Sequence, residues 1–327
     1  MSLGTRPTRK ALSSLYSVLD YTDHLRLNEP DLGYTTTASS SNPEVNRYRD
    51  ILAYDHALIP AGGPYLNAAY IPPFHPTSLS FITSQAPLPD TYTAFYTHLV
   101  QQRVRVLVNL TPLTEKGRIK ANQYWSSTAS DGGGEIMLDN GWRITSTDET
   151  KIDLEGGQSS LIRRVISIDF SPSPPPNFLG GTRWGVTQFH LTSWPDHGVF
   201  PTTTLLELMR ETQMVAMPKI YPPPPTWIHC SAGVGRSGTL AAAYIAQAAI
   251  GVAKQASDQG GLGEEASKTV YQRDTEAELW DLPVRIVEHL RRYRARMVQT
   301  IDQFEAVYEI VARLATEAGL LVGEAKK

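Results

Sequence analysis

The sequence contains a single cysteine, Cys230, among its 327 residues. One thiol cannot build an internal disulfide framework, and its isolation fits a reducing compartment. Long apolar runs are also scarce: the longest, residues 240–250, is too short to cross a bilayer, and none of signal-peptide length follows the basic N-terminus. We therefore expect a protein located in the cytoplasm, with a nuclear location as the alternative. We expect no membrane partner.

Charge of one sign is missing as well, because 30 lysines and arginines oppose 33 aspartates and glutamates and leave a net charge of −3. Such a balance argues against nucleic acid as a partner. Hydrophobic residues make up 41% of the chain, which suffices for one large core, and no internal repeat divides it. We expect a monomer with one domain over residues 11–316, between an N-terminal tail (1–10) and a C-terminal tail (317–327).

Hydrophobic periodicity and turn residues outline the elements. The pattern predicts helices at residues 11–27, 91–101, 202–217, 281–297 and 298–310, and strands at residues 65–71, 81–87, 104–110 and 162–170. Residues 31–43 are rich in serine and threonine and predict a mobile loop, whereas residues 171–181 and 251–271 predict exposed connections. Arginines cluster near the end of the 281–297 helix, as is typical of a solvated face: Arg291, Arg292, Arg294 and Arg296.

Residues 227–239, WIHCSAGVGRSGT, join a short apolar strand to a strong helix-forming run. Glycine-rich turns at a helix start let backbone N–H groups converge on one point, where the helix dipole adds partial positive charge. Arg236 on that rim can bind an oxyanion with two parallel hydrogen bonds. A cysteine at a helix N-terminus beside an arginine has a lowered thiol pKa. The pattern therefore predicts Cys230 as a nucleophile aimed at a bound phosphoryl group.

Other interpretations of this stretch compete with that one. A lone cysteine is often only a small buried hydrophobic residue. Gly233, Gly235 and Gly238 also match the dinucleotide fingerprint G-x-G-x-x-G, with Asp258 about twenty residues further on. In that fingerprint, however, a second parallel strand should follow the helix, and here a glycine-rich stretch follows. A nucleotide-triphosphatase loop is excluded, because it requires a lysine before its serine or threonine.

The arrangement His229-Cys230-x-x-Gly233-x-x-Arg236-Ser237 resembles the signature loop of the cysteine-dependent protein tyrosine phosphatases. The resemblance implies that Cys230 is the nucleophile and that Arg236 binds the phosphoryl oxygens. It further implies that Ser237 assists departure of the thiolate from the phosphocysteine and that His229 sits behind the loop and tunes the thiol. The loop residues that would surround the phosphate are Ser231, Ala232, Gly233, Val234 and Gly235.

Residues 188–200, QFHLTSWPDHGVF, contain a Trp-Pro-Asp-x-Gly run, which by itself predicts a turn with a capping aspartate. Departure of a tyrosine oxygen from phosphorus needs a proton donor. The phosphatase family carries its acid on a mobile loop of this sequence. The resemblance therefore implies that Asp196 is the general acid and base, on a loop hinged by Pro195 and Gly198.

Residues 46–59 by themselves are compatible with a solvated edge carrying a packed tyrosine ring. They resemble, however, the substrate-recognition loop of the family. By that resemblance Tyr48 would stack on the phosphotyrosine ring and set a pocket depth that phosphoserine cannot span. Asp50 would accept hydrogen bonds from the main chain of the substrate.

Two more segments gain roles only through the resemblance. The charged turn at residues 115–125 is usually solvated, but its family counterpart lies beside the active site. Glu115 would therefore orient the signature arginine, and Lys120 would reach toward the acid loop. Gln299 and Gln303 match two glutamines that direct water at the phosphocysteine. Arg296 stands where some relatives have glycine and would narrow the space beside the site.

The resemblance covers residues 46–310 and implies one α/β domain, with a strongly twisted mixed sheet flanked by helices and insertions at residues 171–181 and 251–271. It implies hydrolysis of phosphotyrosine in protein substrates through a phosphocysteine, without metal or cofactor. Two alternatives stay open. One is a dual-specificity or lipid phosphatase, although Ser231 and Val234 replace the lysines of some lipid-directed relatives. The other is a catalytically dead module that captures phosphotyrosine.

Overall fold

The computed structural model describes residues 6–60, 63–127, 133–147, 149–171, 173–175, 181–194, 198–216, 222–259 and 265–321. Its helices are α1 (Arg9–Asn28), α2 (Thr37–Ser40), α3 (Tyr92–Gln101), α4 (Thr202–Ala216), α5 (Gly235–Gln259), α6 (Glu265–Tyr293) and α7 (Ile301–Glu317). Within these described ranges, no helix combines the length and the apolar character needed to span a bilayer.

The strands are β1 (Ala68–Ile71), β2 (Phe81–Ser84), β3 (Val106–Asn109), β4 (Thr114–Glu115), β5 (Arg118–Ile119), β6 (Ile136–Met137), β7 (Arg143–Ser146), β8 (Thr150–Leu154), β9 (Ser159–Asp169), β10 (Arg183–Leu191) and β11 (Thr226–His229). The large sheet has the order β1-β2-β11-β3-β10-β9-β7-β6, and β8 also pairs with β9. The neighbours β2, β11, β3 and β10 run parallel, and the outer pairs are antiparallel. The sheet is therefore mixed, with its parallel part at the centre.

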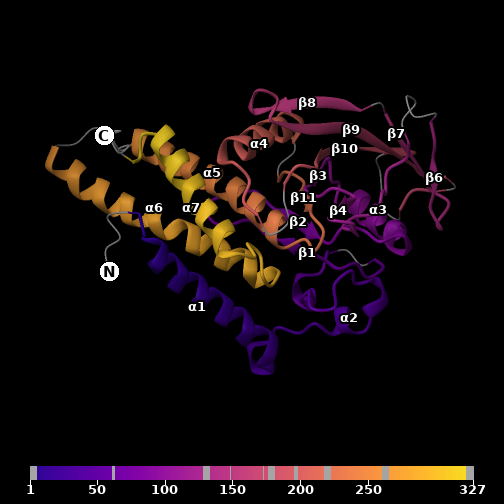
Figure 1. Ribbon diagram of the computed structural model, residues 1–327, viewed down its shortest axis with the longest axis horizontal. Helices are drawn as coiled ribbons and strands as arrows, with labels where there is room; N and C mark the ends of the chain where they lie inside the picture. The colour runs from indigo at the N-terminus through magenta and orange to yellow at the C-terminus, as the bar shows by residue number, and fades with distance from the viewer. Residues whose placement is uncertain are drawn as a thin grey trace.

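Helices cover both faces of this twisted sheet (Figure 1). Side chains of a strand alternate between the two faces, so the neighbours Trp227 and Ile228 of β11 enter two different cores. Ile228 joins the core formed with α4, α5, α6 and α7, whereas Trp227 packs against Phe95 of α3. Strand β3 is fully buried, as its β-branched run predicts. The expected α/β fold is confirmed.

The prediction of a mobile loop at residues 31–43 is wrong. This segment contains α2, whose first N–H groups, on Thr37 and Ala38, donate to the Asp55 carboxylate at 2.9 Å each. Ser39 is fully buried, and its hydroxyl accepts a hydrogen bond from the N–H of Ala53 at 3.1 Å. Groups distant in sequence thus satisfy polar groups of this segment, which its serine- and threonine-rich pattern predicted to be solvated.

Three other predictions about the C-terminal half need correction. Residues 251–259 continue α5 and residues 265–271 begin α6, so helices replace most of the expected exposed connection, while residues 260–264 lie outside the described part. Arg291 and Arg294 are fully buried rather than solvated, because carbonyls and carboxylates surround them. Helix α7 begins two residues after Gln299, at a cap formed by the Thr300 side chain.

Candidate active site

The loop of residues 230–234 joins β11 to the start of α5. Gly233 has φ +74°, and a Cβ at this position would lie 2.0 Å from the carbonyl oxygen of Ser84. Only glycine fits such a left-handed position pressed against neighbouring backbone. The resulting turn directs the N–H of Gly233 at the sulfur of Cys230, 3.2 Å away.

Cys230 is only 3% exposed. Burial raises the pKa of its thiol, but the Arg236 charge, the hydroxyl and N–H of Ser237 and the N–H of Gly233 act against burial and bring the pKa below its ordinary value. Among the described residues, the buried Ser237 hydroxyl has no hydrogen-bond partner of ordinary geometry, so it is available to the sulfur. The site thus favours the thiolate, the nucleophilic form.

Arg236 is held from two sides in a nearly fully buried position. One guanidinium nitrogen donates to the carbonyl of Trp194 at 2.9 Å, and another lies 3.9 Å from the carboxylate of Glu115 at the end of β4. The Trp194 indole in turn donates to the carbonyl of Gly198 at 3.1 Å. Asp196 lies outside the described residues, but the segments on either side of it are tied to each other and to Arg236.

His229 is completely buried behind the loop. Its Nδ1–H donates to the carbonyl of Cys230 at 3.1 Å, so its Nε2 accepts from the hydroxyl of Tyr124 at 2.6 Å. The side-chain amide of Gln188 donates to the same hydroxyl at 2.5 Å. Burial lowers the pKa of His229 to about 3, which keeps the ring neutral. We did not expect Tyr124 or Gln188 from the sequence, although each lies in a stretch that we singled out.

Tyr48 lies at the rim of the site. Its hydroxyl is 2.7 Å from the hydroxyl of Ser231, which itself donates to the carbonyl of Lys120 at 2.6 Å. Tyr48 is therefore the donor in the first bond, and its ring is fixed against the signature loop. Asp50, two residues on, forms an ion pair with Arg296 at 2.9 Å.

The two predicted glutamines lie over the start of α5. The side-chain oxygen of Gln303 accepts from the backbone N–H of Gln299 at 2.9 Å, and its nitrogen lies 3.5 Å from the carbonyl of Gly198. A Cβ at Gly235 would come within 3.1 Å of the Gln303 amide and 3.2 Å of the Gln299 side-chain oxygen. Both amides therefore pack directly against the helix that begins at the signature loop.

Most of the predicted residues line one cavity of about 260 Å³, together with Ile51: Tyr48, Asp50, Lys120, Cys230, Ser231, Ala232, Gly235, Arg236, Gln299 and Gln303. Glu115, His229 and Ser237 lie behind this lining. Val234 does not line the cavity, because its side chain is fully buried in the hydrophobic core. Its predicted role in substrate binding therefore reduces to its backbone.

Similarity to known proteins agrees with the phosphate site that the geometry indicates. The sequence profile of the family described as protein-tyrosine phosphatase matches residues 42–260. Receptor-type tyrosine-protein phosphatase eta of Mus musculus is 31% identical over 291 residues, covering 87% of this chain and 20% of that protein. Receptor-type tyrosine-protein phosphatase S of Gallus gallus is 34% identical over 245 residues, covering 67% of this chain and 14% of that protein. The chain thus spans a fifth or less of these two relatives.

Solved structures share the fold. The catalytic domain of human protein tyrosine phosphatase non-receptor type 18 matches with a TM-score of 0.70 and 22% identity, covering 93% of this chain and 96% of that chain. The phosphatase TcPTP1 of Trypanosoma cruzi matches with a TM-score of 0.70 and 24% identity, covering 97% and 95%. The non-receptor type 18 enzyme has also been solved in complex with HER2 phosphopeptides. Because the family profile spans more than half of the sequence, the chain belongs to the protein-tyrosine phosphatase family.

Proposed function

We propose that this domain hydrolyses phosphotyrosine in proteins by a two-step reaction through a phosphocysteine. The proposal rests on the position of Cys230, which lines the 260 Å³ cavity together with Arg236. Its thiol pKa is lowered despite burial, with the Arg236 charge as the largest favourable cause. A thiolate under a guanidinium and converging N–H groups suits attack on a dianionic ester.

In the first step the sulfur attacks phosphorus, the P–S bond forms, and the bond between phosphorus and the tyrosine oxygen breaks. Asp196 gives its proton to the departing phenolate. The contact between Arg236 and the carbonyl of Trp194 supports this role, because it links the phosphate-binding group to the residue that opens the acid loop. Closure of such a loop over bound substrate would exclude water from the first step.

In the second step a water oxygen attacks phosphorus and the P–S bond breaks, with its electron pair returning to sulfur. The proton of the water passes to Asp196, now the base. Gln299 and Gln303 would orient the water, and their position over the start of α5 supports that assignment. The Ser237 hydroxyl would stabilise the departing thiolate.

Specificity for phosphotyrosine rests on Tyr48. Its hydrogen bond to Ser231 ties the ring to the signature loop at the rim, which supports a pocket of fixed depth. A phosphoserine side chain is too short to carry its phosphate from such a rim to the sulfur. The phosphopeptide complex of the structurally similar non-receptor type 18 enzyme is consistent with phosphotyrosine-containing protein substrates for this chain.

The test is turnover of matched peptides that differ only in carrying phosphotyrosine or phosphoserine. We expect hydrolysis of the phosphotyrosine peptide alone, and its loss in Cys230→Ser. The Asp196→Ala variant should lose 10²–10⁴-fold in kcat, a range typical of a positioned acid, while it still binds substrate. Comparable rates on both peptides would instead indicate a dual-specificity enzyme, and binding without turnover would indicate a capture module.

Two further properties remain part of the proposal: a cytoplasmic location and a monomeric state. A lone reactive thiolate persists best in a reducing compartment, which supports the location. Sedimentation of the purified domain at several concentrations would test the monomer.

A further inference from the structure

We propose that Asp23 of α1 and Arg291 of α6 are positioning residues for the second step, because together they hold the turn that carries Gln299. The inference rests on the proposed function and deepens it. It gives a catalytic consequence to a helix that precedes the segment matched by the family profile.

The turn at residues 295–299 is strained. Arg296 has φ +62° and Val298 has φ +60°, although neither is glycine. The left-handed region is unfavourable for side chains with a Cβ, and a β-branched residue such as valine suits it least. Such a conformation persists only where the surroundings impose it. The groups that bond to this turn are therefore what sets its shape.

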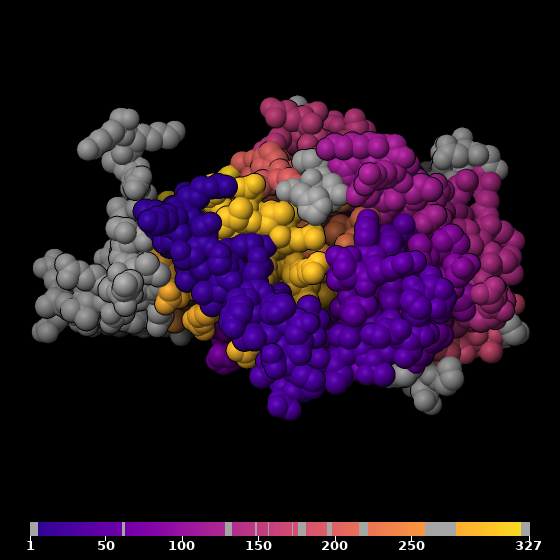
Figure 2. All heavy atoms as spheres, turned by 60° about the horizontal axis from the view of Figure 1, so that its bottom comes forward, coloured from indigo at the N-terminus to yellow at the C-terminus, as the bar shows by residue number. Residues whose placement is uncertain are grey.

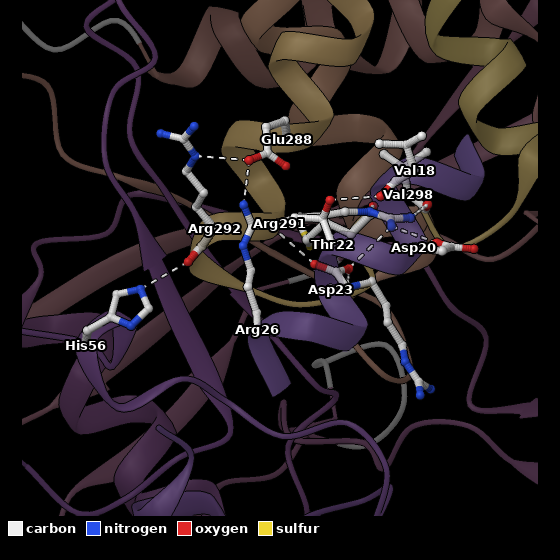
Figure 3. A network of polar contacts seen from close by, with 12 residues as sticks. Val18, Asp20, Thr22, Asp23, Arg26, His56, Glu288, Arg291, Arg292 and Val298 are labelled. Carbon is white, nitrogen blue, oxygen red and sulfur yellow. Dashed lines mark hydrogen bonds and ion pairs between the residues drawn. The ribbon is translucent and has the colours of Figure 1, made fainter. Parts of the chain in front are cut away.

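Arg291 makes two of these bonds. It is fully buried, and its Nε and one terminal nitrogen donate to the carbonyls of Met297 and Val298 at 2.9 and 3.0 Å. The other terminal nitrogen faces α1, 2.7 Å from Asp20 and 3.3 Å from Asp23 (Figure 3). The guanidinium thus joins α1 to the inner side of the turn.

Helix α1 also bonds to the turn directly. The carboxylate of Asp23 accepts from the N–H of Arg296 at 2.8 Å, and the hydroxyl of Tyr16 donates to the carbonyl of Val298 at 3.3 Å. In Figures 1 and 2 the indigo helix α1 lies along the C-terminal helices, drawn in orange to yellow. Both left-handed residues of the turn are therefore bonded to one face of α1.

The other side of the turn contacts the active site. The N–H of Val298 donates to the carbonyl of Val234 in the signature loop at 3.1 Å, and a Cβ on Gly238 would lie 2.4 Å from that nitrogen. The next residue, Gln299, donates its N–H to the side chain of Gln303. A shift of the turn would therefore move both amides that orient water.

The groups of the first step share one contact with the turn, the bond from Val298 to Val234, but their other bonds come from elsewhere. Arg236 is fixed by Trp194 and Glu115, and the sulfur is approached by the N–H of Gly233. Loosening the contacts of α1 should thus slow attack of water on phosphorus, and with it cleavage of the P–S bond, more than it slows formation of that bond. A general loss of packing would slow both steps together.

The experiment uses the full chain with para-nitrophenyl phosphate and rapid mixing. Asp23→Asn and Arg291→Gln are compared with the parent in kcat, in kcat/KM and in the burst of nitrophenolate that reports the phosphocysteine. Gln303→Ala serves as the reference for loss of the water step. Glu288→Gln is the matched control. It removes the ion pair of Glu288 with Arg26, which also joins α1 to α6, and neither partner of this pair belongs to the turn.

We expect kcat to fall about fivefold or more in Asp23→Asn and Arg291→Gln, with kcat/KM within about twofold of the parent and a larger burst, as in Gln303→Ala. Glu288→Gln should keep the burst of the parent. Equal loss in kcat and kcat/KM, or an unchanged burst in a folded Asp23→Asn protein, would overturn the inference. If Arg291→Gln does not fold, Asp23→Asn decides alone. An inactive parent would overturn the proposed function itself, before any variant is compared.

Discussion

Arg296 and Asp50 form an ion pair across the rim of the active site, with 2.9 Å between their nearest nitrogen and oxygen atoms. The pair joins the strained turn to the segment that carries Tyr48. It also stands between the 260 Å³ cavity and a neighbouring cavity of about 430 Å³ that is lined by Arg296 and by carboxylates of α1. Asp50 is therefore already engaged before any substrate arrives, although we assign it to the substrate main chain.

The first prediction concerns this pair. Arg296→Ala should lower KM for a phosphotyrosine peptide, because Asp50 no longer has to leave a partner to bind the peptide backbone. An exposed pair is worth at most about 1 kcal/mol, so the decrease should not exceed about fivefold. Arg292→Ala, which removes the same charge from an exposed position of α6, is the control and should leave KM unchanged. A KM that rises in Arg296→Ala alone would contradict the prediction.

The second prediction concerns the ionisation of Cys230. Since its thiol pKa lies below the ordinary value, the thiolate persists as the pH falls toward that lowered pKa. Alkylation by iodoacetamide should therefore reach its plateau at a lower pH than for a small thiol measured alongside, whose pKa is about 8.5. Ser237→Ala should move the midpoint upward, because it removes a hydroxyl that stabilises the thiolate. A midpoint equal to that of the small thiol would show that burial dominates.

The third prediction concerns the hydrogen bond behind the loop. Tyr124→Phe leaves the Nε2 atom of His229 buried without its donor, which should cost about 1–3 kcal/mol in the free energy of unfolding. Urea denaturation measures this loss. With a pKa of about 3, His229 should contribute no inflection to the pH–rate profile between pH 5 and 8. An inflection in that range that disappears in His229→Gln would refute the neutral assignment.

The fourth prediction contrasts two glycines. In Gly233→Ala the new Cβ would collide with the backbone of Ser84 in a left-handed conformation, which should cost roughly 2–5 kcal/mol of stability and nearly all activity. Gly251→Ala adds its Cβ to α5 where no atom lies within 4 Å. It should stabilise the helix by about 0.5–1 kcal/mol. Equal melting temperatures for the two variants would contradict the assignment of strain to Gly233.

The signature loop of the candidate site could be predicted from the sequence because its residues lie close together in the chain, whereas Tyr48, Glu115 and Asp196 gained roles only through the family resemblance. Cys230, Arg236 and Ser237 lie in one short stretch at the start of α5, so their spacing predicts a phosphate site with a sulfur at its base, and the family resemblance excludes the alternatives. Strand β3 was predictable for a related reason, since a buried β-branched run has few other uses. Its neighbour β10 was not predicted. Structure that depends on neighbouring residues in the chain can be predicted from the sequence.

What the sequence did not reveal depends on partners far away in the chain. The four arginines near residue 294 predicted a solvated face, yet Arg291 is buried because Asp20 and Asp23 approach from a helix about 270 residues earlier. The partner of His229, Tyr124, is separated from it by 105 positions. Composition shows that such groups exist, but only the packing of α1 and of the sheet brings them together.

The parallel centre of the sheet has a consequence for how this protein can vary. Strands β2, β11, β3 and β10 all end at one edge, about 5 Å apart. The residue after β2, Gln85, binds the backbone of Arg47 and so anchors the segment proposed to recognise substrate. The other three strands lead to the proposed nucleophile, to Glu115 and to the loop proposed to carry the acid. Each of these segments thus follows a strand of its own. The sequence or length of one segment can therefore change while the position of Cys230 is kept.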